Sequence, residues 1–85
     1  MNELINVDMK IVENDMVVDL RFDRKMSVFE LAERVCVSVG IEFEDCYVFS
    51  ARCRRLLSKN KSFYDQGILG GDTLILIVIS NREGQ

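Results

Sequence analysis

Cys53 is the residue whose neighbours favour covalent chemistry most, because Arg52 and Arg54 flank it and Arg55 follows. Nearby guanidinium groups favour the thiolate, which is the nucleophilic form of cysteine. A cysteine nucleophile also needs a base that removes its proton, and the chain contains no histidine to serve as one. We therefore interpret Cys53 as a free thiol and expect a protein that is not an enzyme, with no catalytic residues.

The residue types and their spacing do not indicate a metal site or a cofactor site. Cys36, Cys46 and Cys53 lack the CxxC spacing of zinc sites and are an odd number for a disulfide framework. The carboxylates of segment 42–45 lie along an extended connector that points them in different directions. The glycines before Thr73 lead into a strand, whereas a phosphate-binding loop leads into a helix and carries a lysine. We expect no metal, no cofactor and a reducing compartment, with Cys36 and Cys46 acting as small hydrophobic residues.

A basic segment covers residues 52–61 of an otherwise acidic chain. It holds five of the 11 lysines and arginines, whereas the net charge of the chain is −3. Arginine binds phosphates and acidic protein surfaces, but this segment has little aromatic interleaving and no nucleic-acid motif. We favour a solvated loop and expect no nucleic-acid partner, and we retain two of its arginines as residues that orient a protein partner. The basic residues are Arg52, Arg54, Arg55, Lys59 and Lys61.

The first half of the chain predicts two strands and one helix. Apolar and polar residues alternate over 4–12 and again over 18–23, and the turn-forming segment 13–15 between them indicates a β-hairpin. Ser27 and Glu30 have the spacing of a capping box, in which each side chain bonds the other's backbone amide. Apolar residues then recur at helical spacing until Gly40. We expect one helix from Ser27 to Val39.

The second half predicts a short strand over 46–50, a brief return to the sheet at Leu56 and Leu57, and a single helical turn over 63–65. Its clearest feature is a run of six apolar residues, 74–79, close to the end of the chain. Such a run indicates a strand that is covered on both faces for much of its length. We expect this last strand to lie in the middle of the sheet.

Alternation along the last strand separates two sets of side chains. If Leu74, Leu76 and Val78 point to the core, the residues between them point to the opposite face. We expect the neighbouring strand to add Val48 to that face, with Val12 near its rim. A contiguous exposed apolar patch in a soluble protein usually marks an interaction surface, although a second copy of the chain or its own tail could also cover it. The predicted partner-binding residues are Val48, Ile75, Ile77, Ile79, Arg54 and Arg55.

The order of these elements resembles ubiquitin and the wider β-grasp family. The pattern Asp65-x-Gly67-Ile68-x-x-Gly71-Asp72-x-Leu74 is similar to the family's approach to its last strand, with Ile68 filling the core and the glycines turning the backbone. The resemblance implies an α+β ubiquitin-like β-grasp fold, a mixed sheet of four to five strands with one helix packed across one face. We expect a single domain over 1–85, with its core at about 4–79 and a frayed tail at 80–85.

Within that family the chain is similar to the EsaB/YukD group of small bacterial ubiquitin-like proteins, which are cytosolic accessory components of type VII (WXG-type) secretion systems. The resemblance implies a non-enzymatic, cytoplasmic protein-interaction module. Its partner would be the cytoplasmic part of a membrane component of the secretion system, and a homodimer is the other partner considered. No apolar stretch reaches the roughly 18 residues that span a bilayer, so we expect no direct membrane insertion.

The resemblance leaves two alternatives. One is a sulfur-carrier or protein-modifier β-grasp protein, which is activated at the carboxylate of a terminal Gly-Gly; here the chain ends Asn81-Arg82-Glu83-Gly84-Gln85, and the only Gly-Gly is Gly70-Gly71, where a turn is expected. The other is an adaptor domain cut from a larger eukaryotic protein. We expect it to be the weaker alternative because the domain begins at Met1 with little flanking sequence.

Overall fold

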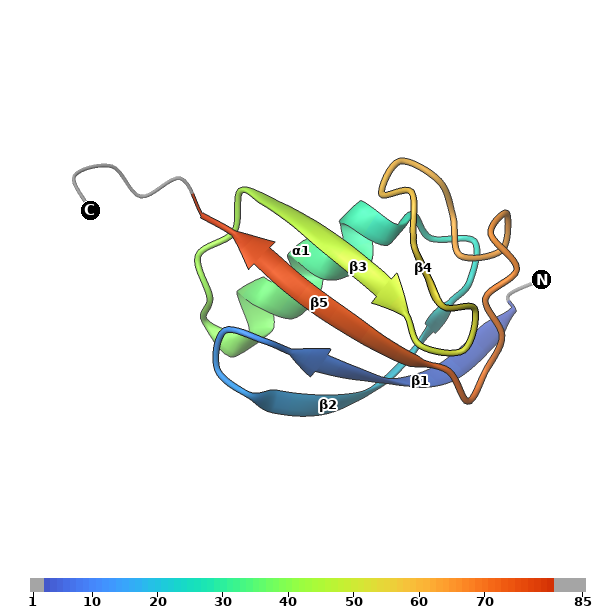
Figure 1. Cartoon of the computed structure of the whole chain (residues 1–85), viewed down its shortest axis with the longest axis horizontal. Coiled ribbons are helices and arrows are strands. Elements are labelled where there is room, and N and C mark those ends of the chain that lie inside the picture. The colour runs from blue at the N-terminus through green and yellow to red at the C-terminus, as the bar shows by residue number, and fades with distance from the viewer. Residues whose placement is uncertain (1–2, 81–85) are drawn as a thin grey trace.

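The computed structural model describes residues 3–80, which form one mixed sheet and one helix (Figure 1). The sheet has five strands in the order β2-β1-β5-β3-β4. The pair β1 and β5 is parallel, and the other neighbouring pairs are antiparallel. The elements are β1 (Leu4–Ile11), β2 (Met16–Asp23), α1 (Val28–Val39), β3 (Asp45–Ser50), β4 (Arg55–Leu56) and β5 (Thr73–Ile79).

The last strand occupies the centre of the sheet, as predicted from its apolar run. β5 pairs with β1 on one side, where Met9 lies opposite Leu74, and with β3 on the other. Beyond the end of β1, the Glu13 carboxylate accepts a hydrogen bond from the Val78 backbone N–H at 3.1 Å. The backbone after β1 turns away from β5 at this point. The Glu13 side chain therefore accepts the hydrogen bond that a carbonyl of a neighbouring strand would otherwise accept. Most of the predicted frayed tail, residues 81–85, lies outside the described residues.

The helix begins and ends where its capping residues predict. Ser27 has extended backbone angles, and its side-chain oxygen accepts a hydrogen bond from the Glu30 N–H at 3.1 Å. Gly40 ends the helix in the left-handed conformation at φ 78°. The second half of the predicted capping box is wrong, because the Glu30 carboxylate lies 2.9 Å from the Arg34 guanidinium one turn away.

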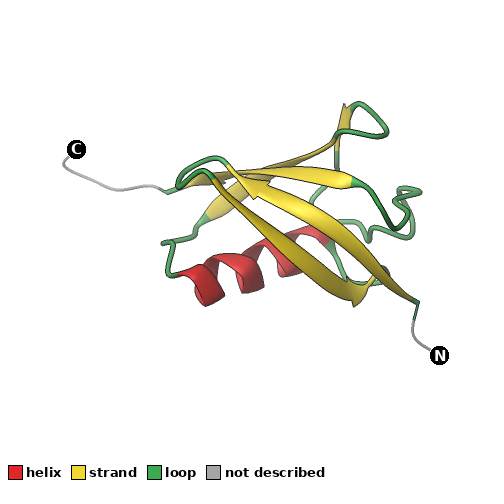
Figure 2. Ribbon diagram, turned by 90° about the horizontal axis from the view of Figure 1, so that it is seen from below, coloured by secondary structure: helices red, strands yellow, loops and turns green. Residues whose placement is uncertain are grey.

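The helix α1 lies across one face of the sheet, as Figure 2 shows from the edge, and the core side chains lie between the two layers. Each strand alternates, so the inward set comes from every second residue of β1, β3 and β5. Val28, Leu31 and Val35 of α1 cover these side chains. The fully buried strand residues include Val7, Met9, Ile11, Cys46, Val48, Leu74 and Leu76.

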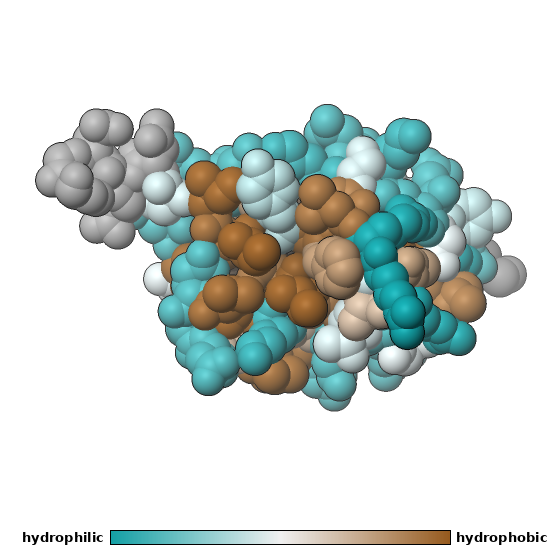
Figure 3. Space-filling view, in the orientation of Figure 1, coloured by the Kyte–Doolittle hydropathy of each residue, from teal (hydrophilic) through white to brown (hydrophobic). Residues whose placement is uncertain are grey.

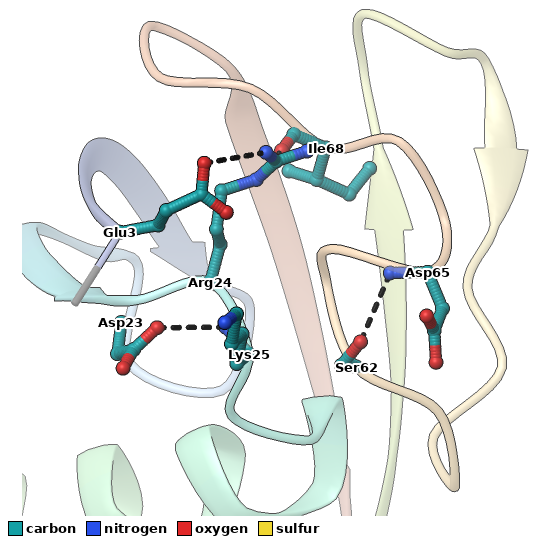
Figure 4. A network of polar contacts seen from close by, with 7 residues as sticks. All are labelled: Glu3, Asp23, Arg24, Lys25, Ser62, Asp65 and Ile68. Carbon is teal, nitrogen blue, oxygen red and sulfur yellow. Dashed lines mark hydrogen bonds and ion pairs between the residues drawn. The ribbon is translucent and has the colours of Figure 1, made fainter. Parts of the chain in front are cut away.

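The long segment between β4 and β5 closes the end of the core with Phe63 and Ile68, which are both fully buried. Residues 63–67 form the predicted single turn as a turn of the 3₁₀ type, because the Gln66 and Gly67 N–H groups donate to the carbonyls three residues earlier. Arg24 joins this segment to the start of the chain. Its Nε donates to the Ile68 carbonyl at 3.0 Å, and its terminal nitrogen lies 3.7 Å from the Glu3 carboxylate (Figure 4).

The predicted glycine turn before β5 is confirmed at Gly71, whose φ is 88°. A side chain there would be strained, because L-residues rarely adopt this left-handed conformation. Gly71 donates its N–H to the Asn6 carbonyl at 2.8 Å, so the turn also sets where β5 starts beside β1. Within residues 3–80, no helix has the length and apolar character needed to cross a membrane.

Candidate functional site

The face of the sheet opposite α1 is covered by no other described element, and it carries a continuous apolar strip (Figures 2 and 3). Ile75 and Ile77 of β5 lie opposite Phe49 and Tyr47 of β3, and residues directly opposite in an antiparallel pair share a face. Leu56 of β4 lies opposite Phe49 and extends the strip toward the sheet edge. We call Tyr47, Phe49, Leu56, Ile75, Ile77 and Ile79 the outer apolar face.

The members of the outer apolar face differ in how much surface they offer. Ile77 is 42% exposed, Tyr47 is 49% exposed and Leu56 is 55% exposed. Ile75, Ile79 and Phe49 are half-buried. In Figure 3 the hydrophobic colour is concentrated along the middle of this face, and hydrophilic side chains border it. Ile77 is therefore the exposed residue of the central strand in this strip.

The prediction that Val48 lies on this face is wrong. Val48 is 1% exposed and lies opposite Leu76, which belongs to the core set. The neighbouring residues Tyr47 and Phe49 point outward in its place. The sequence did not separate the two possibilities, because both alternate sets of β3 are largely apolar.

A tight turn over residues 51–54 joins β3 to β4 and borders the outer apolar face beside Leu56. Arg52 and Arg54 are exposed on this turn, and Arg54 has a φ of 58°. Arg55 is not brought to the same face, because it lies opposite the buried Ser50 and donates a hydrogen bond to the Gln66 carbonyl.

The remaining basic residues are separated from the turn. Lys59 forms an ion pair with Asp45 at the start of β3, and this hydrogen-bonded contact lowers the pKa of the Asp45 carboxyl and raises that of the Lys59 amine. Lys61 is exposed on the long segment after β4. The five basic residues are therefore close together in the sequence but lie in separate places in the fold.

Comparison with solved structures finds ubiquitin-like domains among the similar folds. The ubiquitin-like domain of tubulin-binding cofactor B is 18% identical, with a TM-score of 0.74 and 93% of each chain covered. The corresponding domain of Plasmodium falciparum Dsk2 is 19% identical, with a TM-score of 0.73 over 91% of this chain and 100% of that one. Caldiarchaeum subterraneum ubiquitin is 15% identical, with a TM-score of 0.73 over 92% of this chain and 96% of that one.

The chain has the ubiquitin-like β-grasp fold. At these identities the likeness establishes the fold alone. No family model and no curated protein matches the sequence. The resemblance to ubiquitin stated from the sequence is therefore confirmed for the fold, and the EsaB/YukD subgroup stays a prediction.

A hollow of about 200 Å³ lies over the start of β5, below the roughly 300–1,000 Å³ typical of ligand pockets. It is lined by Asn6, Val7, Asp8, Asp19, Gly71 and Asp72. Among residues 3–80, no three His, Cys, Asp or Glu side chains lie close enough together to hold a metal ion.

The three cysteines divide into one exposed and two buried thiols. Burial raises the pKa of Cys46 to about 11 and also raises the pKa of Cys36, so both thiols stay protonated at neutral pH. Cys53 is exposed on the turn after β3. The prediction that Cys36 and Cys46 act as small core residues is confirmed.

We expect an alkylating reagent such as iodoacetamide to modify Cys53 alone in the folded protein. The other two thiols lack both solvent access and thiolate character, so they should react only after unfolding in denaturant. Intact mass spectrometry counts the added groups, and peptide mapping locates them. Rapid modification of Cys36 or Cys46 under native conditions would contradict the buried placement of these residues.

Proposed function

We propose that this ubiquitin-like domain is a non-enzymatic protein-interaction module that docks through its outer apolar face. The observation that carries the proposal is the continuous strip from Leu56 through Phe49 and Ile75 to Ile77, which no described element covers. Apolar strips of this kind are uncommon on the surface of a protein that works alone. In this proposal Val48 has no contact with the partner and Tyr47 takes its place.

The exposed part of the strip supplies a share of the binding energy that a transient complex needs. Full burial of one large apolar side chain stabilises by about 1.5–3 kcal/mol, and Tyr47, Leu56 and Ile77 have each gained roughly half of that already. The three together therefore offer on the order of 3–4 kcal/mol before the costs of association. A specific complex then needs further contacts. Arg54 is placed to supply one of them by attracting an acidic surface of the partner.

The finer proposal is an accessory or regulatory role in a bacterial type VII secretion system. It is supported by the sequence Gly71-Asp72-x-Leu74, one of the features on which the resemblance to the EsaB/YukD group depends. In this role the partner is the cytoplasmic part of a membrane component, and the domain itself stays in the cytoplasm. Partner-binding residues in the proposal are Ile75, Ile77, Ile79, Tyr47, Phe49, Leu56 and Arg54.

Ile77→Asp is expected to lower partner affinity at least tenfold, because it places a charge in the middle of the apolar strip. The measurement is affinity capture from the source cells, identification of the captured protein by mass spectrometry, and titration of that purified protein. Val37→Asp is the matched control, since Val37 is 74% exposed on the helix, on the other side of the molecule.

Equal affinity of Ile77→Asp and wild type, with both proteins folded, would remove the outer apolar face from the proposal. A captured protein that belongs to no secretion system would reject the finer proposal and leave the coarser one standing. The alternative, a sulfur carrier, predicts instead a chain shortened to Gly84 whose terminal carboxylate has exchanged one oxygen for sulfur, with the mass increase of that exchange. Intact mass of the protein purified from its own cells distinguishes this alternative.

A further inference from the structure

The turn over residues 51–54 has every backbone donor satisfied, although it contains no regular structure. The Ala51 N–H donates to the Thr73 carbonyl at 2.9 Å, and the Arg54 N–H donates to the Ser50 carbonyl at 2.8 Å. The Arg52 N–H donates to Asp72 Oδ1 at 3.1 Å, and the Cys53 N–H donates to Ser50 Oγ at 3.1 Å. Two of the four donors thus depend on side chains outside the turn.

Asp72 and Ser50 are joined to each other in the interior. Asp72 is 2% exposed and Ser50 is fully buried. The Ser50 hydroxyl donates to Asp72 Oδ2 at 2.6 Å, while Asp72 Oδ1 also accepts the Thr73 N–H at 2.7 Å. Hydrogen bonds to an ionised carboxylate in a poorly solvated place are shorter and stronger than neutral ones. A partner on the surface could contact neither side chain.

Without these hydrogen bonds the turn would not keep its conformation. Arg54 has a left-handed φ of 58°, which costs a residue with a side chain of order 1 kcal/mol or more. Such strain persists only where the surrounding contacts hold the backbone in that conformation. Asp72 precedes β5 and Ser50 ends β3, so these two residues link the turn to the strands that form the outer apolar face.

We infer that Asp72 and Ser50 form a latch that presents Arg52 and Arg54 to the partner in one fixed place at the border of the outer apolar face. This inference rests on the proposed function. Both latch residues are positioning residues, since they act on the partner only through the turn. Without the latch, binding would have to order the turn and two long side chains, and that ordering opposes association.

The test compares Asp72→Asn and Ser50→Ala with wild type. In Asp72→Asn the amide oxygen still accepts two N–H groups, but the Ser50 hydroxyl loses its acceptor. In Ser50→Ala the Cys53 N–H loses its acceptor. Ser50→Ala is expected to raise the hydrogen-exchange rate of the Cys53 amide roughly tenfold or more. Asp72→Asn is expected to raise that of the Arg52 amide, because a neutral amide oxygen is a weaker acceptor than a carboxylate. The amides of β1 and β5 should change less in both variants. NMR at a temperature where each variant is fully folded gives these rates residue by residue.

The binding arm uses a peptide selected from a random library on the wild-type protein, after depletion of the library on Ile77→Asp. Each latch variant is expected to bind this peptide roughly three- to tenfold more weakly, with a smaller dependence on salt. In a background carrying both Arg52→Ala and Arg54→Ala, the same variants should cause no further loss, because the groups that the latch positions are gone. Val35→Ala, which weakens the core beneath α1, is the control and should leave peptide affinity unchanged.

Three results would overturn the latch. They are unchanged exchange in the turn, a loosened turn with wild-type affinity, and an equal loss of affinity in the arginine-free background. In each of these results Ile77→Asp still abolishes peptide binding, so the proposed function stands. If no peptide depends on Ile77, the proposed function fails first and the latch fails with it.

Discussion

Val48→Asp is expected to unfold the protein, whereas Ile77→Asp should leave it folded. Val48 is 1% exposed beside Leu76, so an aspartate there would bury a carboxylate without a partner. An uncompensated buried charge costs about 3–5 kcal/mol, which is comparable to the whole stability of a small domain. Circular dichroism during urea titration measures the loss.

Ile77→Asp introduces an aspartate on the opposite face of the sheet, so the comparison of the two variants measures the effect of burial. Ile77 lies one position along β5 from Leu76 and points to the opposite side of the sheet, where it is 42% exposed. The same substitution is therefore expected to lower the free energy of unfolding by only about 1–2 kcal/mol at this position. Similar losses in the two variants would show that β3 does not have the register described here.

Phe63→Ala is expected to lower the free energy of unfolding by about 3–5 kcal/mol, through lost burial and the cavity that remains. Phe63 is fully buried, and its ring centroid lies 4.8 Å from that of Phe22. Its backbone carbonyl accepts the Ile68 N–H at 3.0 Å, so the cavity would also loosen the segment that closes the core. Thermal and urea unfolding followed by circular dichroism give the change.

Tyr64→Ala is the control for that prediction. Tyr64 is the next residue, but it is 48% exposed, and the Arg24 guanidinium lies 4.7 Å from the centre of its ring. Losing that exposed cation–π contact should cost about 0.5–1 kcal/mol. If the two variants were equally destabilised, Phe63 would not be the residue that closes this end of the core.

The local elements could be predicted from the sequence because short-range physics specifies them. The capping serine and the terminal glycine of α1 act within one turn of the helix, so Ser27 and Gly40 marked its ends correctly. Alternation over β1 predicted its buried side for the same reason, since polar and apolar residues there occupy opposite faces. The apolar run of β5 correctly placed that strand at the sheet centre, but the expectation that both of its faces are covered holds only on the side of α1, because Ile77 is 42% exposed on the other side.

The candidate site was predicted in part. Ile75, Ile77 and Ile79 were placed on the correct face, because the buried set Leu74, Leu76 and Val78 determined the alternation of their own strand. Across to β3 the prediction for Val48 was wrong and Tyr47 was missed. A shift of one residue in register moves every side chain to the other face, and nothing within a strand states how it aligns with a distant one.

The sequence by itself determined which segments become strands or helix, which strand is central and which of its side chains face outward. Only the tertiary structure decided the register of β3, the burial of Phe63 and the separation of the basic residues. It also decided that Asp72 meets Ser50 across 22 positions of the chain. Contacts within a turn follow from neighbouring residues, whereas contacts between distant residues depend on how all the elements pack together.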